Sequence, residues 1–369
     1  MKLSRREFGQ LGAMGLAALA LPGVRAEAQD GERKVGYCVI GLGRIADHFM
    51  RGTAQGKTSK ITGLVSGHRD KAERIATQYG VPKDSIYSYE DMDRVRDNKA
   101  IDAVYVALPN SMHAEYTIRS AKAGKHVFCE KPMSISVKEA EAMIAACKAA
   151  NVKLMIAYRL HYEPITLKAI QMVRDGTLGK VQAISSANGF NIAPGEWRST
   201  KALGGGGPLM DVGIYSLNAT RYLTGEEPEK FTAVVSTIDH DGRFETVEEN
   251  TSWTMEFPSG VLASCVTTYG ASMPGYYKVF GSKGWLEVGT FGYQNLRLRA
   301  SYTVGVKGSA ATNVDETNPE PDPMQFVREI DHFTECILQN KTPKTPGEEG
   351  LADMKYIQAI YRAAGISFD

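Results

Sequence analysis

The stretch VGYCVIGLGRIA, residues 35–46, is an apolar run that ends abruptly at a glycine-rich turn. Its first six residues predict a buried β-strand, and Gly41, Gly43 and Ala46 follow at the spacing of a dinucleotide-binding fingerprint. Gly41 permits the tight turn, Gly43 lets backbone N–H groups approach a pyrophosphate, and the small Ala46 lets the next helix pack against the strand. The helix N-terminus then presents unpaired amides and its positive dipole end to the phosphates.

The context of this turn favours a bound dinucleotide over an ordinary strand-to-helix turn, because Ile45, Phe49 and Met50 continue directly into a helical pattern. Strands and helices then alternate as far as Ile156, which predicts βαβ units and a parallel sheet. The expected strands cover residues 61–66, 103–107, 126–129 and 153–157, and the expected helices cover residues 71–79, 92–96, 113–123 and 137–150. A short segment around residues 86 and 87 lies between the first two of these helices. This half of the chain is therefore expected to be a doubly wound dinucleotide-binding (Rossmann) domain.

The second half of the chain has a different pattern. After an expected helix at residues 164–175, short runs rich in Val, Thr, Tyr and Phe are separated by turn signals, and several alternate apolar with polar residues. These runs cover residues 181–186, 231–238, 249–257, 260–269, 276–280 and 284–288. They predict an α+β domain with a mostly antiparallel sheet, one face of which helices cover. A loop is expected at residues 310–323, followed by helices at residues 324–339 and 348–364.

Composition limits the class of protein. The chain has 369 residues, 43% of them hydrophobic, which at about 150 residues per domain suggests two domains. Its net charge of +1 gives no reason to expect nucleic acid or an anionic membrane as a partner. The five cysteines are scattered without a CxxC pair, which argues against a disulfide framework and a zinc site. Cys38 and Cys129 are expected in the core, and no metal is expected.

The first 28 residues have the features of an export signal. Arg5 and Arg6 form a twin-arginine pattern, an apolar run follows at residues 11–21, and residues 26–28 (AEA) suit a signal peptidase. The apolar run is too short to cross a bilayer core of about 30 Å. We expect the folded chain to be exported to the periplasm, to begin near Gln29 and to keep no membrane anchor after cleavage. The alternative is a chance Arg-Arg pair before an apolar run.

The residues after the second expected strand bear on which dinucleotide binds. A cofactor with a free 2′-hydroxyl usually meets an Asp or Glu about 20 residues after the glycines, whereas a 2′-phosphate favours basic or hydroxyl-bearing side chains. The chain offers at this place Ser66, Gly67, His68, Arg69 and Lys71. NADP is therefore expected. Asp70 is the residue that argues against it, and its alternative role is to cap the helix.

Three further segments carry a family resemblance: Ala107–Asn110 with His113, then Glu130–Pro132 (EKP), then residues 204–215 (GGGGPLMDVGIY). In this order and spacing the chain resembles the glucose-fructose oxidoreductase, inositol dehydrogenase and rhizopine-catabolism (Gfo/Idh/MocA) family over nearly its whole mature length. The resemblance implies a Rossmann domain followed by an open-faced sheet domain. It also implies oxidation or reduction of sugars with a nicotinamide cofactor.

Within that family, residues 158–164, Trp197-Arg198 and Tyr215 look most like the glucose-fructose oxidoreductase branch, and the export signal agrees. That enzyme has a long arm between its signal and its first strand, whereas only a few residues separate Gln29 from the first strand here. The chain is therefore more similar to the armless aldose-aldose oxidoreductases. The expected parts are a signal at 1–28, an NADP-binding Rossmann domain at 29–157, a substrate-binding domain at 158–345, and a helix at 346–369 that packs back on the core.

Lys131, Asp211 and Tyr215 are the expected catalytic residues. Lys131 follows a strand that ends at the carboxyl edge of the parallel sheet, where such sheets bind ligands, although surface lysines are also common there. Tyr215 is the candidate proton carrier, and because tyrosine side chains have a reference pKa of about 10, a nearby ammonium is needed to stabilise a phenolate. Asp211 lies one helical turn earlier on the same face, where it either serves the site or simply complements the helix dipole.

The fingerprint and the resemblance together suggest the remaining contacts. The expected cofactor contacts are Gly41, Leu42, Gly43, Arg44, Ile45, Ser66, Gly67, Arg69, Lys71, Leu108, Pro109, Asn110, His113, Glu130, Lys131, Arg159, Trp197 and Arg198. The expected sugar contacts are Lys131, Arg159, Tyr162, Trp197, Arg198, Asp211 and Tyr215. Aromatic faces stack on the C–H surfaces of sugars and guanidinium groups bind pairs of hydroxyls, but each such residue has a core or surface position as its alternative. His113 is given no acid–base role.

The leading hypothesis is a periplasmic oxidoreductase that keeps NADP bound. In a ping-pong cycle it oxidises an aldose to its lactone and reduces a second sugar to an alditol. The alternatives are a conventional NADP-dependent aldose dehydrogenase that releases its cofactor, and a catalytically silent sugar-binding protein. The open sheet face either pairs with a second copy of the chain or faces water.

Overall fold

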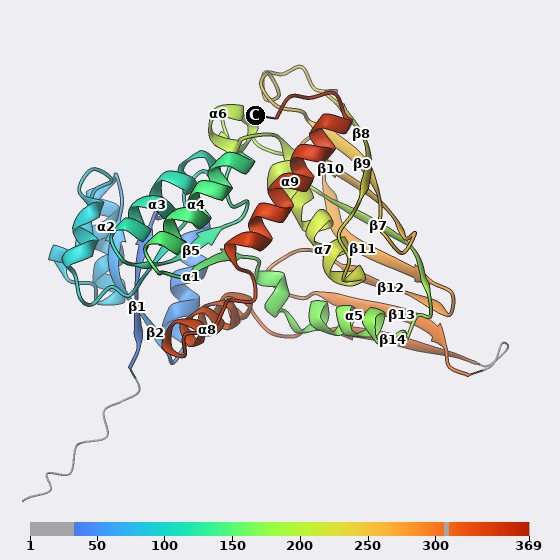
Figure 1. Ribbon diagram of the computed structural model, residues 1–369, viewed down its shortest axis with the longest axis horizontal. Coiled ribbons are helices and arrows are strands. Elements are labelled where there is room, and N and C mark those ends of the chain that lie inside the picture. The colour runs from blue at the N-terminus through green and yellow to red at the C-terminus, as the bar shows by residue number, and fades with distance from the viewer. Residues whose placement is uncertain (1–32, 306–309, 369) are drawn as a thin grey trace, which may run out of the picture. The chain divides into compact units, whose positions relative to one another are not determined.

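The computed structural model describes residues 33–305 and 310–368, and the expected export signal at residues 1–28 lies outside this range. From Lys34 onward the chain forms one compact unit built on two sheets (Figure 1). Among the described helices, none combines the length and the apolar character that crossing a membrane requires.

The first sheet has six parallel strands in the order β3-β2-β1-β4-β5-β6. Its strands are β1 (Val35–Ile40), β2 (Ser59–Val65), β3 (Ile86–Tyr87), β4 (Ala103–Val106), β5 (His126–Glu130) and β6 (Leu154–Ala157). All six residues of the central strand β1 are buried, as its unbroken apolar sequence predicts. This strand order is that of the doubly wound dinucleotide-binding fold, so the expected fold of this half is confirmed.

The connecting helices also follow the sequence pattern. They are α1 (Arg44–Gln55), α2 (Arg69–Tyr79), α3 (His113–Lys122) and α4 (Val137–Ala149). The expected helix at residues 92–96 is instead a 3₁₀ helix, Met92–Asp97, which is the tighter form that short connections commonly adopt. All five cysteines are buried and unpaired, so the predicted core positions of Cys38 and Cys129 are confirmed.

The second sheet has eight strands in the order β14-β13-β12-β11-β7-β10-β9-β8. They are β7 (Val181–Gly189), β8 (Lys230–Ser236), β9 (Asn250–Glu256), β10 (Leu262–Thr268), β11 (Met273–Gly281), β12 (Gly284–Gly289), β13 (Arg297–Thr303) and β14 (Ala311–Thr317). All neighbours pair antiparallel except β7 and β10, which run parallel. The predicted mostly antiparallel sheet is confirmed.

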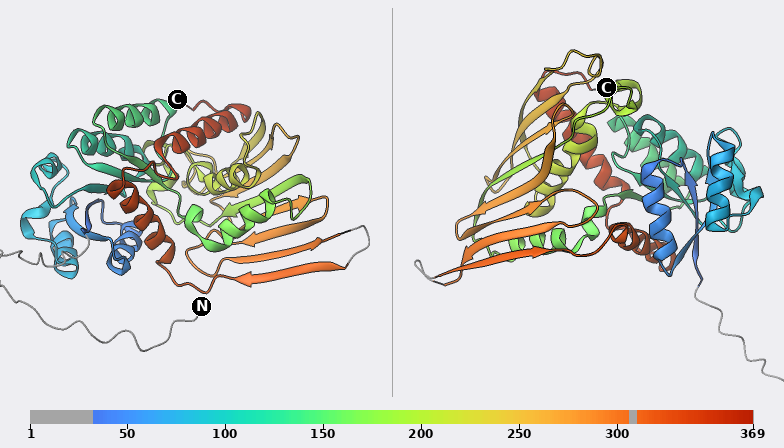
Figure 2. Two further views of the ribbon diagram at one scale, coloured as in Figure 1. Left: turned by 60° about the horizontal axis from the view of Figure 1, so that its bottom comes forward. Right: turned by 180° about the vertical axis from the view of Figure 1, so that it is seen from behind.

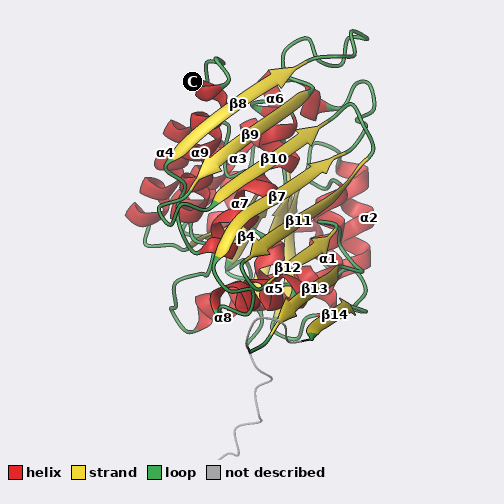
Figure 3. Cartoon of the chain, turned by 90° about the vertical axis from the view of Figure 1, so that its right-hand side faces the viewer, coloured by secondary structure: helices red, strands yellow, loops and turns green. Residues whose placement is uncertain are grey.

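Helices cover only one face of this sheet. α5 (Pro164–Arg174) packs on β12 and β13, α7 (Ile214–Thr224) on β7 and β10, and α9 (Gly347–Ala363) on β8. Figure 3 shows the strands from the other face, with the helices behind them. The alternation within β9 follows this division, because Trp253 and Met255 are buried whereas Ser252 and Thr254 are exposed.

The expected loop at residues 310–323 is wrong over half of its length. Residues 311–317 form β14, the edge strand, which pairs antiparallel with β13 and places Asp315 opposite Arg299. Six of the seven residues of this edge strand are exposed, so the strand needs no continuous apolar face. The alternation of apolar and polar residues that marks the other strands is therefore missing from its sequence.

α8 (Met324–Leu338) departs from the expected domain division. The sequence places it in the second domain, but Phe326 and Phe333 lie in the same core as Tyr37 and Phe49 of the first. The close approach depends on Gly52 of α1, since a Cβ there would stand 3.0 Å from the Cβ of Phe326. α8 therefore belongs to the first domain, whereas α9 lies between α4 and the second sheet (Figure 2).

A buried arginine joins α7 to α9. The side chain of Arg221 is 3% exposed and pairs with Glu227 and Asp353, each at 2.6 Å, and also with Glu349. Asp353 accepts a further hydrogen bond of 2.9 Å from the amide of Asn218. Burial raises the pKa of Asp353, and the charge of Arg221 opposes that shift. The arginine thus supplies the positive charge that the fully buried carboxylate of Asp353 requires.

We expect Arg221→Met to lower the free energy of unfolding by about 3–5 kcal/mol, because it leaves Asp353 buried without its counter-charge. Chemical denaturation measures this difference. Arg297→Met is the matched control, since Arg297 pairs with Asp315 on the surface with 54% of its side chain exposed and should cost less than about 1 kcal/mol. Equal losses in the two variants would contradict the assigned role of Arg221.

Candidate active site

A cleft of about 710 Å³ lies where the carboxyl ends of the parallel strands meet the second sheet. One side is formed by residues that follow strands β1, β4, β5 and β6. The other side is formed by residues 188–193 and 196–198, by the start of α7, and by loops of the second sheet at residues 273–275 and 290–293. Open α/β sheets bind their ligands at this edge.

The glycine turn forms the entrance to α1. Gly41 has a φ of 84°, and a Cβ there would stand 2.4 Å from the carbonyl oxygen of Ala107. A Cβ on Gly43 would meet nothing within 4 Å, and no side chain caps the helix that begins at Arg44. The first amides of α1 are therefore free of a side-chain cap, and Arg44 and Ile45 line the cleft. This arrangement fits a pyrophosphate group.

The residues expected to bind a 2′-phosphate lie together after β2. Ser66 and Gly67 form the turn, and Arg69 begins α2. Arg69 donates to the carboxylate of Glu73 at 2.9 Å and to the carbonyl oxygen of Ile86 at 3.0 Å, so the protein itself positions this guanidinium. Lys71 is exposed on the same helix.

The loop after β4 contacts the second half of the chain. Leu108 and Asn110 line the cleft, with Pro109 between them. The Asn110 side-chain amide donates a 2.9 Å hydrogen bond to the carbonyl oxygen of Gly204, the last residue of α6 (Lys201–Gly204). The expected cofactor loop is thereby held against the start of the glycine-rich segment.

His113 is a structural residue at the edge of the cleft. Its ring nitrogens lie 2.8 Å from the carbonyl oxygen of Pro132 and 2.9 Å from that of Leu108. Burial lowers the pKa of His113 to about 4. The ring is therefore neutral at pH 7 and donates to only one of the two carbonyls, which agrees with the absence of an assigned acid–base role.

Lys131 and Asp211 form an ion pair at the floor of the cleft. The ammonium donates to a carboxylate oxygen of Asp211 at 2.9 Å and to its backbone carbonyl at 2.7 Å. Burial alone would lower the pKa of Lys131, but the charge of Asp211 outweighs it and the pKa is raised. Burial alone would raise the pKa of Asp211, and the nearby cations Lys131 and Arg198 hold it below its ordinary value. Both groups are therefore charged at neutral pH.

Tyr215 lies beside this pair. A π-helical turn, Leu209–Gly213, carries Asp211 and runs directly into α7, where Tyr215 is the second residue. The ammonium of Lys131 lies 4.9 Å from the centre of the Tyr215 ring, and Arg159 Nη2 lies 3.4 Å from its phenol oxygen. The structure thus brings the three expected catalytic residues together. Asp211 and Tyr215 lie on one continuous helical segment, and Lys131 lies opposite them, directly after strand β5.

Trp197 and Arg198 are expected to contact the cofactor or the sugar. They lie on the rim of the cleft that residues 196–198 form. Arg198 lies 4.4 Å over the ring of Trp197, and its Nε is 3.3 Å from Asp211. Glu196 pairs with Arg198 at 3.4 Å and with Arg44 of α1 at 3.3 Å. Arg44, Trp197 and Arg198 therefore lie together at the outer edge of the cleft.

Glu130 and Arg159 line the cleft from the first domain. The Glu130 carboxylate accepts hydrogen bonds from the hydroxyl of Tyr105 and, at 3.2 Å, from the backbone N–H of Lys131. Arg159 is 5% exposed. Its guanidinium donates to the carbonyl oxygen of Gly292 at 2.7 Å, to that of Phe291 and to the side-chain oxygen of Gln325. Arg159 therefore has few donors left for a sugar hydroxyl.

Tyr162 does not reach the cleft, and its expected sugar contact is wrong. The side chain is buried in the core of the first domain, with its hydroxyl 3.5 Å from Thr345 Oγ1 and 3.8 Å from Met155 Sδ. The chain turns through a 3₁₀ helix, Arg159–Tyr162, so residues three positions apart point into different surroundings. Arg159 faces the cleft, whereas Tyr162 packs beneath α8.

Sequence reasoning missed Tyr269, a buried residue at the end of β10. Its hydroxyl donates to the second carboxylate oxygen of Asp211 at 2.8 Å, and burial raises the pKa of Tyr269 well above its ordinary value. The hydroxyl therefore stays protonated and holds Asp211 in place. The only sequence signal for Tyr269 is its position at the end of the strand predicted at residues 260–269. Within the described residues, no group of three or more His, Cys, Asp or Glu side chains is arranged to hold a metal ion.

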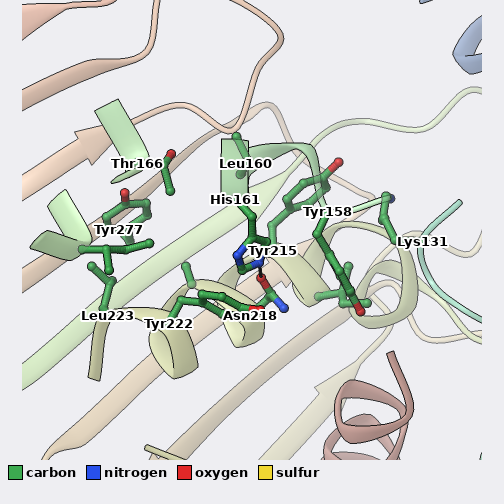
Figure 4. Close-up of a pocket in the computed structure, with 13 residues that line it drawn as sticks. Lys131, Tyr158, Leu160, His161, Thr166, Tyr215, Asn218, Tyr222, Leu223 and Tyr277 are labelled. Carbon is green, nitrogen blue, oxygen red and sulfur yellow. Dashed lines mark hydrogen bonds between the residues drawn. The ribbon is translucent and has the colours of Figure 1, made fainter. Parts of the chain in front are cut away.

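A second cavity, of about 30 Å³, lies between α5 and α7 (Figure 4). His161 lies inside it and bonds Asn218 at 2.5 Å, with Thr166 and Tyr277 to one side and Lys131 to the other. Burial lowers the pKa of His161 to about 3. The ring is therefore neutral, and this cavity is an apolar space beneath the site rather than a second site for acid–base chemistry.

The sequence matches two family models in succession. Residues 35–158 match the oxidoreductase family with an NAD-binding Rossmann fold, Gfo/Idh/MocA, and residues 166–287 match the Gfo/Idh/MocA C-terminal domain. The chain belongs to the Gfo/Idh/MocA oxidoreductase family. The resemblance carried by the glycine turn, the EKP segment and the glycine-rich segment is thereby confirmed.

Relatives of this Gfo/Idh/MocA protein include sugar enzymes. The crystal structure of aldose-aldose oxidoreductase from Caulobacter crescentus, complexed with glycerol, is 46% identical with a TM-score of 0.84, over 90% of this chain and 98% of that one. D-xylose 1-dehydrogenase [NADP(+)] of Haloarcula marismortui is 28% identical over 90% of this chain and 92% of its own. A 3-ketoreductase from Actinomadura kijaniata, in complex with NADP and TDP-benzene, shares the fold at 22% identity and a TM-score of 0.78, over 90% and 98% of the two chains.

Glu329 of α8 is a buried acid near the cleft that the sequence did not single out. It is 2% exposed, and its Oε1 has no hydrogen-bond partner. Burial, reinforced by the charge of Glu130, raises the pKa of Glu329 well above its ordinary value of 4.5, and Arg159 opposes the shift. Burial in the folded protein therefore favours the protonated form of this carboxyl.

The raised pKa of Glu329 makes stability depend on pH. The stability that its protonated form contributes is complete below the ordinary pKa of 4.5 and is lost as the pH rises toward the folded value. We expect Glu329→Gln, which cannot ionise, to weaken this loss, measured as the free energy of unfolding at several pH values from 4.5 upward. Glu335→Gln on the same helix is the control, because Glu335 is paired with Lys341 at the surface. An unchanged slope in Glu329→Gln would refute the assignment.

Proposed function

We propose that this protein is a sugar oxidoreductase that uses NADP and Tyr215 to move a hydride and a proton. The observation that carries the proposal is the placement of Lys131, Asp211 and Tyr215 around one cleft that is also lined by Arg44 and Ile45, the residues that follow the glycine turn. Secondary alcohols and aldoses need both a hydride acceptor and a group that takes the hydroxyl proton. The cleft has room for a nicotinamide as the hydride acceptor, and Tyr215 is the residue that can take the hydroxyl proton.

The residues fit a phosphorylated dinucleotide. The uncapped start of α1 suits the pyrophosphate, and the open space around Gly43 leaves room for it. The turn after β2 has Ser66 and Arg69 where a carboxylate would select NAD, which favours a 2′-phosphate. The NADP named for the D-xylose dehydrogenase relative supports the same choice. A bound nicotinamide would supply the hydride acceptor and donor that the oxidation of one sugar and the reduction of another require.

The protein groups then have distinct tasks. Lys131, fixed by Asp211, directs a positive charge toward the sugar oxygen. Tyr215 as phenolate takes the hydroxyl proton while the carbon–hydrogen bond breaks, and as phenol it returns a proton when a carbonyl is reduced. Trp197 and Arg198 line the outer cleft, where an aromatic face and a guanidinium suit a pyranose ring. Tyr269 holds Asp211 through a hydrogen bond and touches neither substrate.

A ping-pong cycle with retained cofactor is the form of this activity that we propose. One aldose is oxidised to its lactone and a second sugar is reduced to an alditol. The similarity to an aldose-aldose oxidoreductase supports it, and so does the twin-arginine pattern, because a periplasmic enzyme has no free nicotinamide pool to draw on. The D-xylose dehydrogenase relative favours the second candidate, a conventional dehydrogenase that releases its cofactor. We also propose that two copies of the chain form a homodimer through the open face of the second sheet.

We expect the purified, dialysed protein to contain NADP in near one-to-one amount, measured by absorbance and mass spectrometry. Incubated with glucose and no added cofactor, it should accumulate lactone and alditol in equal amounts over many turnovers. An empty protein that turns over only with added NADP would establish the conventional dehydrogenase instead. If no aldose changes the absorbance of bound nicotinamide, the result would favour a catalytically silent sugar-binding protein.

Tyr215→Phe should fold and keep its cofactor but lose about 100-fold or more of the turnover rate, because the ring remains and only the proton-carrying oxygen is removed. Steady-state turnover and the absorbance of bound NADP measure the two properties separately. Tyr276→Phe is the matched control, since that hydroxyl belongs to the second sheet and does not line the cleft. Wild-type rates from Tyr215→Phe would remove this residue from the mechanism.

A further inference from the structure

Arg159 is a buried cation whose hydrogen-bond partners are all uncharged. The guanidinium donates to the carbonyl oxygens of Gly292 and Phe291 and to the side chain of Gln325. Among the described residues, no carboxylate oxygen lies within the 4.0 Å of an ion pair with Arg159. Buried charges are normally paired, so the lack of a counter-ion at this position requires an explanation.

The other lysine and arginine side chains that line the cleft are already balanced. Arg44 lies 3.3 Å from the carboxylate of Glu196. Lys131 pairs with Asp211 at 2.9 Å, and Arg198 lies 3.3 Å from the same carboxylate and 3.4 Å from Glu196. Each therefore has an anion in contact before any ligand binds. Arg159 is left as the cation beside Tyr215 that lacks an anion, with Nη2 3.4 Å from the phenol oxygen and Cζ 5.3 Å from the ring centre.

We propose that Arg159 is the counter-charge for the Tyr215 phenolate rather than a ligand of the sugar. The inference rests on the proposed function, in which Tyr215 is the proton carrier. In the oxidation of a sugar, the carbon-bound hydrogen leaves with both electrons as a hydride to the nicotinamide. The hydroxyl proton passes to the phenolate oxygen, and the carbon–oxygen double bond forms. Arg159 keeps its proton throughout, and the phenolate forms again beside it when a second carbonyl accepts the proton and the hydride.

The surroundings of Arg159 hold its charge in place for this task. Three neutral acceptors fix the guanidinium, so little rearrangement is needed when the phenolate forms. Tyr293 stacks on it at 4.5 Å. Of the acids that face it, Glu329 is buried so that its neutral form is favoured, and Glu130 accepts hydrogen bonds from the Tyr105 hydroxyl and from the backbone N–H of Lys131. Neither carboxylate contacts the guanidinium closely enough to replace the phenolate as its partner.

The test is the rate of the aldose half-reaction in Arg159→Gln, followed by the absorbance of bound nicotinamide in a single turnover. At pH 7 we expect a loss of about tenfold or more, because no cation without a partner remains beside the phenol. Near pH 10, where tyrosine side chains ionise without assistance, most of the rate should return. A loss of equal size at both pH values would overturn the proposal, since a defect in folding or sugar binding would give that result.

Two variants separate the possible failures. Tyr215→Phe should be slow at every pH, and a normal rate from it would refute the proposed function rather than this inference alone. Arg159→Lys keeps the charge but not the planar fork, so it should retain more of the pH 7 rate than Arg159→Gln and respond less to alkali. If Arg159→Gln does not fold, the comparison of Arg159→Lys with wild type at the two pH values decides, and an equal loss at both overturns the proposal.

Discussion

The ion pair between Lys131 and Asp211 is the contact on which the site depends. Lys131 comes from the end of a parallel strand in the first sheet, and Asp211 comes from the helical segment that covers the second sheet. The two side chains are 13% and 15% exposed, so each charge relies on the other for its solvation. Because the pair joins two separately built halves, the catalytic arrangement exists only when the halves are packed against one another.

The rest of the cleft is organised around this pair. Tyr269 and Arg198 bond to the same carboxylate from the second sheet and from the outer rim, which fixes its orientation. The neutral ring of His113 supports the EKP segment through the carbonyl of Pro132. These partners leave the ammonium of Lys131 directed at Tyr215 and the cleft. Burial keeps the rings of His113 and His161 uncharged at neutral pH.

Much of the fold could be predicted because its signals are local. The glycine turn and the alternating strands and helices of the first domain are visible in the sequence, and so are most strands of the second. The strand β14 could not be predicted, because an exposed edge strand has no apolar face to mark it. The position of α8 could not be predicted either, because its apolar face fits more than one surface and only the close approach at Gly52 selects α1.

The sequence by itself determined the strand, turn and first helix around Gly41 and Gly43, since these depend on backbone conformation within a few residues. It also determined that Lys131, Asp211 and Tyr215 are present at recognisable places in a known pattern. Only the tertiary structure decided what each side chain meets. Arg159 and Tyr162 are neighbours in one short segment, yet the first lies beside Tyr215 and the second lies in the core. Burial and partners are set by elements far apart in the chain, and no local pattern records them.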